Sequence, residues 1–101
     1  MSIEKPEHDF CILIADDDMD DQYMMKQAFS SINLNENVQT VNDGVELLDY
    51  LHKRGKYKGI DTPSPKVILL DLNMPKKDGR ECLKEIKTNP KFNRIPVVIY
   101  S

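Results

Sequence analysis

The chain has 101 residues, of which 40% are hydrophobic and 31% charged, and its formal net charge is −3. These values fit one soluble globular domain, and the acidic balance excludes the basic face that nucleic-acid binding needs. No apolar run approaches the ~20 residues of a membrane span, and residues 1–9 form a polar N-terminal extension without the pattern of a signal peptide. We therefore expect a cytoplasmic protein that binds neither nucleic acid nor membrane.

The first predicted strand, Phe10 to Ala15, is apolar throughout, as strands covered on both faces of a sheet are. A helix is predicted from about Met19 to Ile32, with Asp18 as its N-cap. Four apolar residues at helical spacing form its expected core face: Met25, Ala28, Phe29 and Ile32. Capping explains Asp18 but not Asp16 and Asp17, which come directly after the strand.

A short second strand is predicted over Asn37 to Val41, followed by a helix to about Arg54. Asp43 and Glu46 at the start of this helix fit a capping box. Its expected apolar stripe consists of Val45, Leu47, Leu48 and Leu51. Gly55 to Pro65 is a predicted loop, longer than the usual ~2 to 6 residues. It is either a tolerated surface insertion, which we favour, or a partner-facing one.

The third predicted strand, Val67 to Leu70, leads through Asp71 into a turn rich in Asn, Pro, Asp and Gly. A third helix is predicted from about Gly79 to Lys87, and a fourth strand from Ile95 to Ser101. The order βαβαβαβ is typical of an α/β fold with a parallel sheet and right-handed crossovers.

Polar side chains stand at the carboxyl ends of three predicted strands. Asp16 and Asp17 follow the first strand, and Asp71 follows the third. Ser101 ends the fourth. Ligands bind such sheets at this edge. If the first and third strands are neighbours in the sheet, their three aspartates form a cluster of carboxylates there. Repulsion within the cluster is relieved by a raised pKa or by a bound cation, and oxygen ligands select Mg²⁺ or a similar ion. Such a metal clamps a phosphoryl group, which a carboxylate in line can attack to form an aspartyl-phosphate.

The sequence resembles the receiver domain of two-component response regulators in three places. These are the pair Asp16-Asp17, the run Leu70-Asp71-Leu72-Asn73-Met74-Pro75-Lys76-Lys77-Asp78-Gly79, and Ser101. More weakly, the Asn42-Asp43-Gly44 helix start and the long loop after this helix look like single-domain regulators that partner phytochrome-type kinases. The resemblance covers residues 10–101 and implies a flavodoxin-like doubly wound parallel sheet with strand order 2-1-3-4.

The resemblance also implies roles for individual residues. Asp71 would be the phospho-acceptor, receiving its phosphoryl group from a sensor histidine kinase or a phosphotransferase in phosphorelay signal transduction. Asp17, Asp71 and the backbone carbonyl of Asn73 would bind Mg²⁺ directly, and Asp16 would bind it through a water. Ser101 would contact the phosphoryl group on activation.

The chain departs from the family pattern after Ser101. The family's fourth helix, its fifth strand ending in Lys and its fifth helix do not follow in this sequence. We therefore expect a receiver domain that is incomplete at its C-terminus. The edge of its fourth strand would be exposed and apolar, which invites pairing with a second copy into a homo-oligomer. The aromatic Tyr100, or one later in the family pattern, would respond to activation.

Two other functions stay open. One is a receiver-like interaction domain that does not cycle phosphate. The other is an enzyme, a phosphatase of the haloacid dehalogenase type, which also uses a strand-end Asp and Mg²⁺. That class has a second Asp two residues after its nucleophile, where this chain has Asn73. We expect a signalling domain that is a phosphorylation target and not a turnover enzyme.

Neither cysteine is predicted to be reactive. Cys11 lies in the first apolar strand and Cys82 in the third helical pattern, without metal-ligand spacing or a local partner. We interpret both as small buried hydrophobic residues.

Overall fold

The structure, a computed structural model, describes residues 11–34 and 37–100. The elements in these ranges are β1 (Ile12–Ala15), α1 (Met19–Ser30), β2 (Val38–Val41), α2 (Gly44–His52), the 3₁₀ helix η3 (Gly55–Tyr57), β3 (Val67–Leu70), α3 (Gly79–Thr88) and β4 (Val97–Ile99). The strands form one parallel sheet in the order β2-β1-β3-β4. The predicted α/β flavodoxin-like sheet is therefore confirmed. No helix in the described part of the chain has the length and apolar character needed to cross a bilayer.

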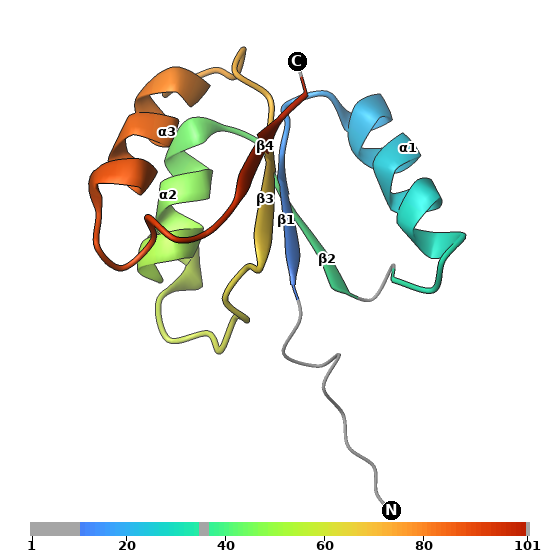
Figure 1. The fold of residues 1–101 in the computed structure, drawn as a ribbon, viewed down its shortest axis with the longest axis horizontal. Coiled ribbons are helices and arrows are strands. Elements are labelled where there is room, and N and C mark those ends of the chain that lie inside the picture. The colour runs from blue at the N-terminus through green and yellow to red at the C-terminus, as the bar shows by residue number, and fades with distance from the viewer. Residues whose placement is uncertain (1–10, 35–36, 101) are drawn as a thin grey trace, which may run out of the picture.

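The helices cover both faces of the sheet. Figure 1 shows α1 alone on one face and α2 with α3 on the other. On the two-helix face, Leu13 and Ile68 of the sheet pack with Leu47 and Ile86 of the helices. On the α1 face, Ile12, Ile14 and Val38 form a smaller cluster. Burial of these apolar surfaces holds the central strands β1 and β3 in place, and with them the residues at their ends.

Each of the three α-helices in the described residues begins with an aspartate that caps it, as predicted for Asp18 and Asp43. The carboxylate of Asp18 accepts the backbone N–H groups of Asp20 and Asp21 at 2.9 and 3.4 Å. Asp43 accepts the N–H of Glu46 at 2.8 Å, and Asp78 accepts that of Arg80 at 2.7 Å. These bonds satisfy backbone donors that have no partner inside the helix.

The predicted core face of the first helix is half wrong. Met25 and Phe29 pack against the sheet, whereas Ala28 and Ile32 are exposed. The helix ends two residues before Ile32, and Asn33 adopts a left-handed backbone conformation with φ of 64°. Helical spacing therefore no longer applies at Ile32. Ala28 lies beside the row that contacts the sheet.

The apolar stripe of α2 also differs from its prediction at one position. Leu47, Leu48 and Leu51 are buried, but Val45 is 43% exposed and borders a hollow lined by charged side chains. Tyr50 takes a buried place that the stripe did not include. The helix ends before the predicted Arg54 because Lys53 turns into the left-handed region, with φ of 56°.

Strand bounds are close to those predicted. β3 spans the predicted residues. β4 is shorter than predicted: it begins after Pro96, which has no N–H group to donate, and Tyr100 lies outside it. The carbonyl oxygen of Pro96 still accepts the N–H of Ile68 at 3.0 Å. Phe10 and Ser101, as well as the N-terminal extension 1–9, lie outside the described residues.

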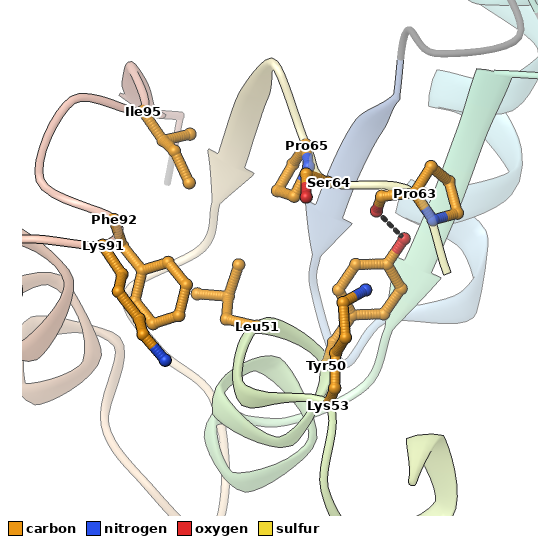
Figure 2. Close-up of a pocket in the computed structure, with 9 residues that line it drawn as sticks. All are labelled: Tyr50, Leu51, Lys53, Pro63, Ser64, Pro65, Lys91, Phe92 and Ile95. Atoms are coloured by element: carbon orange, nitrogen blue, oxygen red, sulfur yellow. Dashed lines mark hydrogen bonds between the residues drawn. The ribbon is translucent and has the colours of Figure 1, made fainter. Parts of the chain in front are cut away.

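The long connection between α2 and β3 is held against the domain by two tyrosines. The Tyr57 ring meets the Tyr50 ring edge-on, with centroids 5.0 Å apart. Tyr50 donates its hydroxyl to the carbonyl of Pro63 at 2.8 Å (Figure 2). Beside this bond lies a cavity of about 160 Å³, bordered by Phe92 and Ile95 before β4. It sits at the amino ends of the strands, opposite the edge where the aspartates were predicted to meet.

Candidate functional site

Three carboxylates meet at the carboxyl ends of β1 and β3. Oxygen atoms of Asp16, Asp17 and Asp71 all lie within 4.8 Å of one another. The pairing of Ala15 with Leu70 brings this about, because the two strands then end side by side. Asp16 and Asp71 are buried, and Asp17 is exposed at the mouth of the cluster.

Hydrogen bonds hold both the carboxylate and the backbone of Asp16. Its Oδ1 accepts the backbone N–H of Asp18 at 2.9 Å, and its Oδ2 accepts the hydroxyl of Tyr100. Its backbone N–H donates to Val41 at 3.1 Å, and its carbonyl oxygen accepts the side-chain amide of Gln22 at 2.5 Å. The carboxylate therefore has a defined orientation at the site.

Asp71 is held by its own turn and by the start of α3. Its Oδ1 accepts the backbone N–H of Asn73 at 2.9 Å, and its own N–H donates to Ala15 at 3.0 Å. A Cβ atom at Gly79 would lie 2.7 Å from the carbonyl oxygen of Asp71, so glycine is required for this close approach. The Asn73 carbonyl stays a predicted ligand, and Ser101 lies outside the described residues.

The clustered negative charges shift the pKa of neighbouring side chains. The pKa of Asp21 is raised chiefly by the negative charge of Asp18, with smaller contributions from burial and from Asp16 and Asp71. Burial first, and then the hydrogen bond to Asp16, raise the pKa of Tyr100, so its hydroxyl stays protonated. This concentration of negative charge favours a cation.

The donor set fits a hard divalent metal. All three side chains offer carboxylate oxygens, which Mg²⁺ prefers, and it usually keeps several waters as further ligands. The two lysines of the adjacent turn do not neutralise the cluster. Lys76 pairs with Asp43 at 3.6 Å, and Lys77 pairs with Glu85 at 2.5 Å.

Sequence reasoning missed Gln22. Its buried side-chain amide donates both to the carbonyl oxygen of Asp16 and, at 2.8 Å, to Oδ1 of Asn42. Asn42 in turn donates its backbone N–H to Glu46 at 2.9 Å. A polar residue at a helical position is ordinarily on the surface, so nothing in the pattern indicated that Gln22 joins α1 to the site.

Comparison with known proteins agrees with this geometry. Residues 12–101 match the family model described as the response regulator receiver domain. The chain is 40% identical over 88 residues to the response regulator Rcp1 of Synechocystis sp., and the match covers 87% of this chain and 58% of Rcp1. The chain thus spans less than two thirds of that relative's length.

Solved structures show the same similarity. The Mn²⁺-bound form of Rcp1 is 39% identical with a TM-score of 0.81, covering 88% of this chain and 63% of that one. The phosphorylated cyanobacterial phytochrome response regulator RcpA is 43% identical with a TM-score of 0.78, covering 87% of this chain and 61% of that one. The family match takes in all four strands of the described sheet, its helices and the aspartates at its edge. The chain therefore belongs to the response regulator receiver domain family, whose members are signalling domains of two-component systems.

Proposed function

We propose that Asp71 accepts a phosphoryl group from a sensor histidine kinase or a phosphotransferase, as one step of a phosphorelay. The observation that carries this proposal is the meeting of Asp16, Asp17 and Asp71 within 4.8 Å at one edge of the sheet. A single strand-end aspartate has many structural uses, whereas the mutual repulsion of three clustered carboxylates favours a bound cation, and a cation at this edge prepares the site for a phosphoryl group.

In this reaction a carboxylate oxygen of Asp71 attacks the phosphorus atom. The new O–P bond forms as the bond from phosphorus to the donor atom breaks, and the donor leaves with its electron pair. Asp17, Asp71 and the Asn73 carbonyl would hold Mg²⁺ directly, and Asp16 would hold it through a water. Magnesium bound there would neutralise charge on the phosphoryl oxygens. Ser101 would contact the phosphoryl group once it is attached.

The test uses a small phosphoryl donor. The protein is incubated with acetyl phosphate and Mg²⁺, and its intact mass is measured. We expect a mass gain of one phosphoryl group that is lost with a chelator and in Asp71→Asn. The control is Asp78→Asn, which changes a helix cap on the same turn but leaves the carboxylate cluster complete. Phosphoryl uptake that persists in Asp71→Asn would refute the proposal, and absent uptake by the unaltered protein would favour an interaction domain that does not cycle phosphate.

The phosphoryl donor we propose is a phytochrome-type histidine kinase in the cytoplasm. The support is the similarity to RcpA, which is named as a phytochrome response regulator. Phosphotransfer from a labelled phytochrome-type kinase should be faster than from a kinase with an unrelated sensor. Equal rates from both kinases would count against this partner.

We also propose that the 101-residue chain forms a homo-oligomer through the edge of β4. Val98 and Ile99 on this strand are 49% and 46% exposed. An exposed apolar edge strand is a template for pairing with another chain. Sedimentation at micromolar concentration should show a dimer or larger species that Val98→Lys converts to a monomer. A monomer before substitution would refute this proposal.

A further inference from the structure

We propose that Tyr100 is a positioning residue of the metal site, and that its hydroxyl holds the Asp16 carboxylate in the orientation that receives a divalent cation. This inference rests on the proposed metal site. It goes beyond that proposal because it gives Tyr100 a role before any phosphoryl group arrives.

Tyr100 follows the edge strand β4, which is separated from β1 by β3. Its backbone N–H donates to the carbonyl of Leu70 at 3.3 Å, which extends the β3–β4 pairing to the residue before Asp71. Its hydroxyl donates to Oδ2 of Asp16, at the end of β1. Because β3 lies between β4 and β1, the Tyr100 side chain spans the carboxyl end of β3, where Asp71 follows.

The Asp16 carboxylate needs donors because it is fully buried. A buried carboxylate is costly unless it is hydrogen-bonded, and hydrogen bonds to ionised groups are the stronger ones. Asp16 receives a backbone N–H from Asp18 on one oxygen and the Tyr100 hydroxyl on the other. The Tyr100 hydroxyl has one proton to donate, and Oδ2 of Asp16 accepts it.

One donor on each oxygen prevents the carboxylate from rotating. An ionised carboxylate has about four acceptor positions, so both oxygens keep capacity for a cation or for water bound to it. Without the Tyr100 hydroxyl, the Asp18 N–H would be the one remaining donor to the Asp16 carboxylate among the described residues, and the carboxylate could turn away from Asp17 and Asp71. Loss of a group that orients a metal-binding side chain typically lowers metal affinity about 10- to 100-fold.

The test is a titration of the full 101-residue chain with Mn²⁺ by calorimetry, with no phosphoryl donor present. We expect Tyr100→Phe to weaken Mn²⁺ binding about tenfold. The matched control is Tyr23→Phe, which removes the same atom from an exposed tyrosine whose hydroxyl accepts from Gln27 on α1. In an Asp16→Ala background, Tyr100→Phe should cause no further loss, since its effect acts through Asp16.

Several results would overturn the inference: no Mn²⁺ binding by the unaltered protein, an unchanged or tighter affinity in Tyr100→Phe, or an equal loss with and without Asp16. If circular dichroism shows that Tyr100→Phe does not fold, the near-ultraviolet tyrosine spectrum of the unaltered protein tests the role of Tyr100 instead. Mg²⁺ should perturb that spectrum, and no perturbation refutes the role of Tyr100. Normal Mn²⁺ affinities without phosphoryl uptake would refute the phospho-acceptor proposal alone and leave this one standing.

Discussion

Gly44 lies against the backbone of Lys77 so closely that a Cβ atom at position 44 would sit 2.0 Å from the Lys77 carbonyl oxygen. Gly44 is the first residue of α2, and Lys77 belongs to the turn between Asp71 and α3. The two nearest obstructing atoms are the backbone O and C of Lys77, which cannot move aside as the end of a flexible side chain can. The start of α2 therefore supports the turn that follows Asp71.

Replacing this glycine should be costly. We expect Gly44→Ala to lower the free energy of unfolding by about 3 kcal/mol, because either α2 or the turn must shift. The control is Gly59→Ala, where nothing lies within 4 Å of the new Cβ atom but φ is +78°. It should cost only about 1–2 kcal/mol from backbone strain. Urea unfolding of both variants measures the difference, and equal losses would show that the Lys77 contact is not limiting.

The strands and the acidic edge were predictable because they follow from short-range patterns. An apolar run such as Val67–Leu70 can be recognised locally, and parallel strands bring their carboxyl ends to one edge whatever the loops do. The approach of Asp16 to Asp71 needed only the choice of neighbouring strands, and the resemblance to receivers supplied it. Helix caps were predictable for the same reason, since Asp43 acts on a donor three residues away.

What escaped prediction depends on contacts between elements. Helical spacing shows which residues share a face, but not how wide a face the sheet covers, so Ala28 was misplaced. Gln22 and Tyr100 were missed as partners of Asp16 because their bonds cross from one element to another. The Tyr100 bond joins residues 84 positions apart, and no local pattern encodes such a contact.

Glu46 should make stability depend on pH. Its carboxylate accepts hydrogen bonds from the Tyr57 hydroxyl at 2.6 Å and from the backbone N–H of Asn42, and it forms an ion pair with the Lys56 ammonium group at 2.8 Å. Burial raises the pKa of Glu46, but the hydrogen bonds from Lys56, Tyr57 and Asn42 outweigh it and lower the pKa below the ordinary 4.5. A lowered pKa in the folded state gives stability that is present above 4.5 and is lost as the pH falls through the folded value.

We therefore expect Glu46→Gln to cost about 1 kcal/mol of unfolding free energy at pH 7, with a smaller difference below pH 4. Urea unfolding across this pH range measures it. Glu85→Gln is the control, because Glu85 is a more exposed partner of a single lysine. If the difference in unfolding free energy between Glu46→Gln and the unaltered protein does not change with pH, the lowered pKa of Glu46 is not a source of stability.

Both cysteines should resist thiol reagents in the native protein. Cys11 and Cys82 are fully buried and form no disulfide. Burial raises the pKa of both thiols, that of Cys82 to about 11, so the reactive thiolate is scarce near neutral pH. A colorimetric thiol assay should detect no reaction in native protein and two thiols after denaturation. Rapid native labelling of either residue would contradict the buried positions.

The amide of Gln22 should matter more than its place on a helix surface pattern suggests. Gln22→Met keeps the length of the side chain but removes the donors to the Asp16 carbonyl and to Asn42. The buried carbonyl oxygen of Asp16 would lose this donor at a cost of about 1–3 kcal/mol, whereas the exposed Asn42 can bond to water, so the unfolding free energy should fall by at least the lower figure. Gln27→Met, on the exposed side of the same helix, should change it by less than about 0.5 kcal/mol. Of these two glutamines, Gln22 bonds to the Asp16 backbone and Gln27 bonds to Tyr23. If the two variants unfold at the same urea concentration, the hydrogen bonds of Gln22 therefore do not hold α1 to the site.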